Sequence, residues 1–236
     1  MKQTLKTIIR NVKSIKGNSL AEFATTTALM ATLAATAAPK LSEMSEGGKA
    51  EKSRNEIDKI IKQAGQFYQD KAETEGRGRF PGQVRHYTGI GSKDGTAYNN
   101  ATTNTVASLT DAHTASDAHE DAMLKDLGLS GVSTEEGWQQ FNQTHEATWV
   151  SVFGTTNADA RKALPSGVSG VINNTTAGIT EWKNLFGGET LGSTFQDGHY
   201  VYGVVAGGGT GTDVYPPIMY VGDIENMVHF NNLLEP

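Results

Sequence analysis

The longest apolar run of the sequence lies near its amino end, at residues 17–39 (GNSLAEFATTTALMATLAATAAP). Five basic residues and no acid precede it, Glu22 is its only charge, and the polar remainder of the chain has no second run of this kind. A basic head, an apolar segment and a polar remainder are typical of an exported chain whose amino end is held at a membrane. Since Ala and Leu are strong helix formers, we expect a helix from Asn18 to about Ala38, just before Pro39.

Two cleavage sites fit this pattern. An ordinary signal peptidase could cut after Ala35-Thr36-Ala37, but Glu22 would then lie inside the apolar heart of the signal, where an unpaired carboxylate is costly. Cleavage between Gly17 and Asn18 instead keeps the apolar helix in the mature chain. It also places a new α-amino group four residues before Glu22, so the two charges can meet within one subunit or between two.

Gly17, followed five residues later by Glu22, then by Phe23 and an Ala/Leu-rich helix, resembles the processing and methylation motif of type IV pilins and pseudopilins. The resemblance covers roughly the first 85 residues, although Asn18 stands where the family usually has Phe or Met. It implies that a prepilin peptidase cuts after Gly17, and that Glu22 guides assembly by pairing with a neighbour's new amino terminus. Pro39 becomes residue 22 of the mature chain, where many family members have a kinking proline.

The resemblance also implies a division of the chain: a leader peptide at 1–17, an apolar helix and a weak section at 18–48, and a globular headgroup at 49–236. Pro39, Gly47 and Gly48 lower helix stability, so we expect residues 39–48 to be a weak section of a long helix or a break. Beyond it, apolar residues recur on one face of a 3.6-residue period and predict a helix that packs on a sheet; they are Ile57, Ile60, Ile61, Ala64 and Tyr68.

The clearest strand patterns are Tyr200 to Val205 and Ile218 to Val221, joined by the glycine-rich loop 206–213. Weaker strand patterns occur at 84–88 and 105–109, and helical ones at about 114–128 and 165–186. The predicted fold class is therefore α+β. A long N-terminal helix with a proline kink packs on an antiparallel sheet with helical insertions, as in pilins.

Composition excludes several functions. Without the leader, 15 Lys and Arg face 26 Asp and Glu, a net charge of about −11, which argues against a nucleic-acid partner. The absence of cysteine excludes disulfides and thiol chemistry. There is no nucleophile elbow, zinc signature or nucleotide-binding loop, so we do not expect an enzyme.

Calcium is the one cofactor that the sequence suggests. Asp197, Asp213 and Asp223 flank the C-terminal strands at their turns, and loop carboxylates beside carbonyls suit Ca²⁺. Major pseudopilins hold Ca²⁺ in a C-terminal loop, so the resemblance implies the same here, while solvated turn acids remain the alternative. A second group of metal-ligand types is better explained by capping and the dipole of a helix that Gly128 ends; it comprises His113, Asp117, His119, Glu120 and Asp121.

We therefore expect a structural subunit of a type IV pilus-like or type II secretion pseudopilus filament. Its partners would be a prepilin peptidase and further copies of itself in a helical filament. It would lie in the inner membrane before assembly and then in a periplasmic or extracellular filament at the bacterial cell surface. The alternative is an exported, membrane-anchored or secreted binding module for carbohydrate or surface adhesion, using Trp138 and Trp149. Core packing is the other explanation of these aromatic residues.

Overall fold

A computed structural model describes residues 2–91, 120–129, 149–155, 174–195, 198–208 and 215–236, with the backbone alone at 2–18. The chain divides into two compact units, Met1–Gly48 and Lys49–Pro236, and each is described by itself. The predicted strand at 105–109 lies outside the described residues.

Helix α1 runs from Lys2 to Glu75 and contains Pro39. The backbone of 39–48, including Gly47 and Gly48, is helical, so the expected alternative of a break is wrong. Good helix formers on both sides, among them Ala, Leu, Glu and Lys, offset the cost of one proline and two glycines.

Four strands form one antiparallel sheet in the order β1-β2-β3-β4 among the described residues. They are β1 (Val150–Ser151), β2 (Tyr200–Val205), β3 (Ile218–Asp223) and β4 (Asn231–Leu234). In the central pair Tyr202 lies opposite Val221. Both strands with a clear sequence pattern are confirmed, and so is the α+β class with a long N-terminal helix on an antiparallel sheet.

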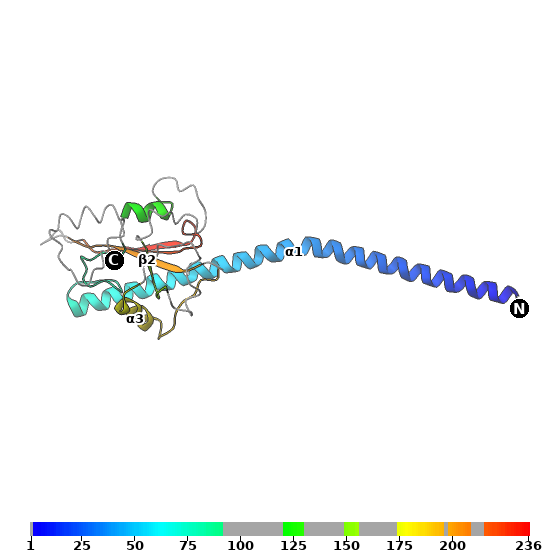
Figure 1. Ribbon diagram of the computed structural model, residues 1–236, viewed down its shortest axis with the longest axis horizontal. Helices are drawn as coiled ribbons and strands as arrows, with labels where there is room; N and C mark the ends of the chain where they lie inside the picture. The colour runs from blue at the N-terminus through cyan, green and yellow to red at the C-terminus, as the bar shows by residue number, and fades with distance from the viewer. Residues whose placement is uncertain (1, 92–119, 130–148, 156–173, 196–197, 209–214) are drawn as a thin grey trace. The chain divides into compact units, whose positions relative to one another are not determined.

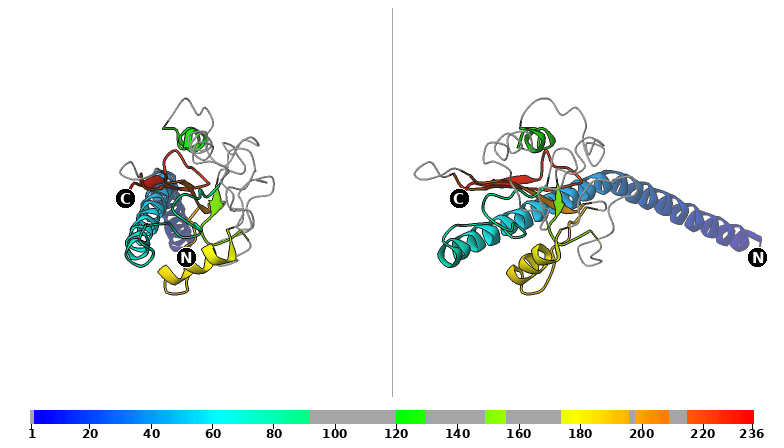
Figure 2. Two further views of the ribbon diagram at one scale, coloured as in Figure 1. Left: turned by 90° about the vertical axis from the view of Figure 1, so that its left-hand side faces the viewer. Right: turned by 60° about the vertical axis from the view of Figure 1, so that its left-hand side comes forward.

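The headgroup part of α1 and the short helix α3 (Thr176–Leu185) cover one face of this sheet, and a helix at 120–126 covers the other (Figures 1 and 2). Because successive side chains of a strand point to opposite faces of the sheet, β2 contributes residues to two hydrophobic clusters, one on each face. The first joins the predicted stripe of α1 to the strands through Ile57, Ile60, Ala64, Tyr200, Tyr202, Val204, Met219 and Val221. The second joins the 120–126 helix to the opposite face through Met123, Leu127, Trp149, Val201, Val205, Tyr220 and Ile224.

The predicted helical insertions are confirmed where they are described. Met123 and Leu127 are buried, and Gly128 has a φ of +69° just after the 120–126 helix, as expected of a residue that ends it. Helix α3 is capped by Thr175, whose hydroxyl accepts from the amide of Gly178. The remainder of the predicted stretches, 114–119 and 165–173, lies outside the described residues.

The strand predicted at 84–88 is wrong, because these residues form turns. The Thr88 hydroxyl accepts from the amide of Arg85 and donates to the carbonyl of Arg85, and the Gln83 amide donates to the carbonyl of Thr88. These local side-chain bonds replace the ladder that a strand would have needed.

The turn after α1, residues 76–83, is tied to both α1 and α3. The Arg79 guanidinium lies 2.9 Å from Glu75 and 2.9 Å from Glu181 of α3, and the amide of Gly82 donates to the other Glu181 oxygen at 2.7 Å. The hydroxyl of Tyr202 in β2 donates to the carbonyl of Pro81 at 3.0 Å. This turn therefore fixes the end of α1 against the sheet.

We predict that Gly82→Ala destabilises the headgroup by about 3 kcal/mol or more. Gly82 has a φ of +87°, and an added Cβ would lie 2.5 Å from the buried Tyr202 hydroxyl. Gly76→Ala is the matched control, since Gly76 has a φ of +79° but nothing within 4 Å of its Cβ position. It should cost only the backbone strain, about 1–2 kcal/mol. Denaturation followed by the fluorescence of the buried Trp149 and Trp182 measures both, and equal losses would contradict the predicted clash.

Candidate functional site

The apolar segment of α1 is the most unusual surface among the described residues. From Ser19 onward its large hydrophobic side chains are exposed, with Phe23 at 72 % and Met30 at 71 %. By length and composition this helix could cross a membrane, and no residue of its most apolar stretch is buried. About 20 helical residues span about 30 Å, the thickness of a bilayer's hydrocarbon core.

The five threonines of this segment keep their hydroxyl groups paired within the helix. Thr25, Thr26, Thr27 and Thr36 each donate to the carbonyl four residues earlier, at 2.7 to 3.0 Å, and Thr32 donates to the carbonyl of Leu29 at 2.9 Å. Such back-bonding needs no water or neighbour. The helix surface is therefore less polar than its composition suggests, and it suits either lipid or closely packed protein.

Glu22 is the only charged side chain between Ser19 and Pro39. It is exposed, and no ion pair to it occurs among the described residues, although its backbone carbonyl accepts from Thr25 and Thr26. Phe23 and Pro39 are exposed on the same helix. Gly17 and Asn18 lie within α1, but their side chains are not described, so the processing site stays a prediction.

The calcium prediction can be followed at one of its three residues. Asp223 ends β3 and is fully buried. Its Oδ2 accepts from the Ser193 hydroxyl at 2.6 Å, and its Oδ1 accepts from the amides of His199 and Glu225 at 3.2 Å. The carboxylate therefore holds the segment before β2 and the turn after β3 together.

Asp197 and Asp213 lie outside the described residues, so calcium binding stays a prediction. Within the described ranges, no three His, Asp or Glu side chains are grouped as a metal would need. Of the other suggested ligands, Glu120 accepts from the Tyr220 hydroxyl at 2.7 Å and Asp121 is exposed, whereas 113–119 are not described.

Burial raises the pKa of Asp223 from 3.8 to about 6, although the hydrogen bonds from Ser193 and from the two amides oppose the shift. A carboxyl group with a raised pKa keeps its proton in the folded state to a higher pH than in the unfolded state. Its contribution to stability is therefore largest below about pH 4 and is lost as the pH rises through about 6.

Trp149 is completely buried, and its indole N–H donates to Asp126 at 2.8 Å. It is a core residue and has no surface for a sugar. Trp138, the other aromatic residue of the alternative function, lies outside the described residues.

The sequence did not indicate the buried pair Ser151 and His199. The Ser151 hydroxyl lies 2.5 Å from Nε2 of His199 between β1 and the start of β2. Asp223 lies nearby but bonds to the backbone amide of His199. Because Ser151 is 0 % exposed, no substrate can reach its hydroxyl, and the pair is a structural link. A single Ser in a two-residue strand gives no sequence signal for this link.

Comparison with protein-family models, curated proteins and solved structures finds no match to this chain.

We predict that Asp223→Asn removes part of the pH dependence of folding. Between about pH 4 and 7, the free energy of unfolding of the wild type should fall relative to that of the variant, by about 2–3 kcal/mol. Urea denaturation at several pH values measures this difference. Glu73→Gln, which removes an exposed acid of α1, is the control. Parallel pH profiles for wild type and Asp223→Asn would mean that Asp223 does not titrate as proposed.

Proposed function

We propose that this chain is a structural subunit of a type IV pilus-like or type II secretion pseudopilus filament. The observation that carries the proposal is the apolar segment of α1, which exposes its large side chains and a single carboxylate without an ion-pair partner among the described residues. Such a surface needs an apolar environment, which lipid or the helices of neighbouring subunits can supply.

The composition of the segment favours helix packing over simple anchoring. A membrane anchor needs only to be apolar, and Leu, Ile and Val would serve. Here the run is dominated by Ala and Thr, whose small side chains let helices approach closely. Since the Thr hydroxyls are paired internally, neighbouring helices can pack on them without leaving polar groups unsatisfied.

Glu22 gives the assembly its specificity in this proposal. Cleavage after Gly17 creates an ammonium group on Asn18, and the same group of an adjacent subunit can reach Glu22 in a helical array. In the low-dielectric interior of a filament, this attraction is screened little by salt, so it favours one axial register.

The route to the filament follows from the charges. The leader's five basic residues hold the amino end on the cytoplasmic side of the inner membrane. There a prepilin peptidase removes the leader, and the apolar helix holds the subunit until it joins a periplasmic or extracellular filament. The headgroup, which contains the sheet, then forms the outer surface.

We expect the mature protein to begin at Asn18, because only that cut retains the apolar helix. Amino-terminal sequencing or intact-mass analysis of the membrane-extracted protein measures this. A chain that begins at Ala38 or Pro39 would have lost the helix, and would contradict the filament proposal in favour of a secreted binding module.

We expect Glu22→Ala to leave export and headgroup folding intact and to reduce filament formation by more than about tenfold. Alanine leaves the neighbour's ammonium unpaired in an apolar interior, which costs more than a lost surface salt bridge. The measurement compares sheared surface filaments with membrane-extracted monomer.

Glu46→Ala is the matched control, because Glu46 is an exposed acid on the same helix outside the apolar segment. It should assemble normally. Normal filaments from Glu22→Ala, or an equal defect in both variants, would show that Glu22 is not an assembly residue.

A further inference from the structure

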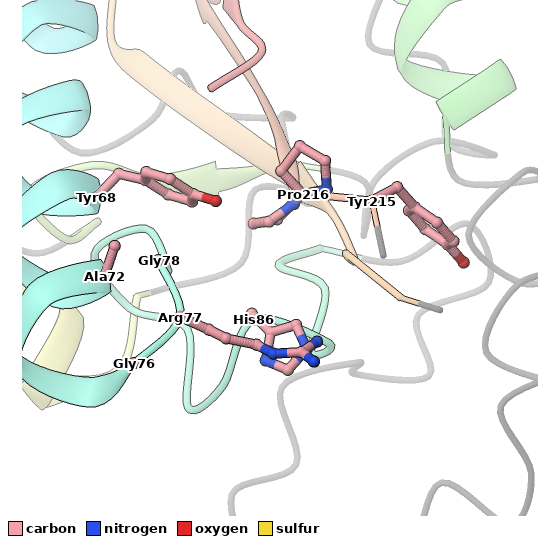
Figure 3. Close-up of a pocket in the computed structure, with 9 residues that line it drawn as sticks. Tyr68, Ala72, Gly76, Arg77, Gly78, His86, Tyr215 and Pro216 are labelled. Carbon is pink, nitrogen blue, oxygen red and sulfur yellow. The ribbon is translucent and has the colours of Figure 1, made fainter. Parts of the chain in front are cut away.

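The headgroup contains a pocket of about 390 Å³, open to solvent, between the end of α1, the turn that follows it and the residues before β3 (Figure 3). Its size falls within the range of small-molecule sites, about 300–1,000 Å³. Tyr68, Arg77, His86, Tyr215, Pro216 and Pro217 supply the side chains that matter here. The site lies wholly within the unit Lys49–Pro236, so the inference does not depend on the filament proposal.

Several polar side chains of this pocket can donate hydrogen bonds, Arg77 among them. Nη1 of Arg77 lies 3.1 Å from Nε2 of His86. A guanidinium can only donate, so Nε2 accepts and the ring proton is on Nδ1. Burial, together with the charges of Arg77 and Arg85, lowers the pKa of His86, which favours the neutral ring. The Tyr68 hydroxyl points toward Pro216 (Figure 3). It has no hydrogen-bond partner among the described residues.

Arg77 is the charge available to a ligand. Within the described residues it makes no ion pair, whereas Arg79, two residues on, is paired with both Glu75 and Glu181. The surrounding segment 77–86 (RGRFPGQVRH) has three arginines and no acid, in a chain of net charge −6. An anion with planar oxygens, such as a carboxylate, matches the guanidinium fork.

The remaining walls include the rings of two tyrosines and two prolines, which the fold holds in place. A Cβ at Gly78 would overlap the Tyr68 ring, so the glycine lies directly against it. Tyr215 exchanges two backbone hydrogen bonds of 3.1 Å with Gly208, and the amide of Gly207 donates to the carbonyl of His86 at 2.9 Å. A preformed pocket loses little entropy when a ligand binds.

We infer that this pocket binds an acidic sugar, a saccharide ring that carries a carboxylate. The carboxylate pairs with Arg77, the ring hydroxyls bond to the Tyr68 hydroxyl, and the C–H face of the sugar packs on the proline and tyrosine rings. The open pocket accepts the end or a branch of a longer chain, from a host glycan or a bacterial polysaccharide. One ion pair in an open site gives a dissociation constant on the order of 1 mM.

The test titrates the full-length protein with glucuronate, in a detergent without a sugar headgroup, by calorimetry and by saturation-transfer NMR. Glucose and the methyl ester of glucuronate are the uncharged comparisons, and inorganic phosphate is a second anion. Glucuronate should bind, and the two neutral sugars should bind at least about tenfold more weakly. This comparison uses the wild type alone, so it decides the matter even where a variant fails to fold.

Arg77→Gln should weaken glucuronate binding by about tenfold or more. Arg85→Gln is the matched control, because it removes an exposed arginine of the same segment that does not line the pocket. It should change the affinity less than about twofold. Tyr68→Phe keeps the ring against Gly78 and should weaken binding moderately.

Three outcomes would overturn the inference. The first is no binding of glucuronate at about 10 mM, tenfold above the expected dissociation constant. The second is equal weakening by Arg77→Gln and Arg85→Gln, which would indicate attraction by general charge. The third is phosphate competing as strongly as glucuronate, which would indicate a site for anions without selectivity for a sugar.

Discussion

The burial of one stripe of α1 against the sheet is the interaction on which the headgroup depends. Ile57, Ile60 and Ala64 are no more than 1 % exposed, and they pack on Tyr202 and Val204 of β2. Burying an isoleucine side chain contributes about 1.5–3 kcal/mol. The buried stripe as a whole therefore contributes more than one ordinary hydrogen bond, which contributes about 1 kcal/mol. They also set the position of the turn after α1, and hence of the pocket beside it.

In a chain without disulfides, two carboxylates link loops to neighbouring elements. They belong to Glu181, which is half-buried, and Asp223, which is buried. Glu181 binds Arg79 and the amide of Gly82, which ties the turn after α1 to α3. Asp223 binds Ser193 and the amides of His199 and Glu225, which ties the segments around β2 and β3. Both use backbone N–H groups as partners, so the links depend on loop conformation and disappear if the loop moves. A chain without cysteine can thus fix its loops, but the link at Asp223 depends on pH.

The sequence predicted the elements that have a strong local pattern. The stripe of α1 has a 3.6-residue period, and β2 and β3 are rich in Val, Tyr and Ile, so residue type alone identifies them. The sequence-based prediction failed where contacts between residues far apart in the chain determine the secondary structure. β1 has two residues, β4 begins with Asn231 and Asn232, and both are strands only because β2 and β3 offer open edges. The composition of residues 84–88 is compatible with a strand. Local hydrogen bonds that involve the side chains of Gln83 and Thr88 stabilise a turn there instead.

The same limit applies to the sites. Glu22 could be predicted as a functional residue because a single acid within an apolar run is a local sequence signal. The role of Asp223 could not, since it looks like a turn acid until Ser193 and His199 are placed beside it. The pocket could not be predicted from the sequence either, because the fold brings Pro216 to Tyr68 and Arg77 from a distant part of the chain.

Under the proposed function, the internal pairing of the threonine hydroxyls decides which group controls assembly. A helix that moves from lipid to a protein array normally exchanges the partners of its polar side chains. Here Thr25, Thr26 and Thr27 keep their partners, since each bonds to its own helix in either setting. The transfer then changes the environment of the apolar side chains very little, because lipid and packed helices are similarly apolar. Glu22 is the only charged side chain of the segment, and it gains an ion-pair partner only in the filament. The energy that distinguishes the correct register from its neighbours is therefore concentrated at this carboxylate.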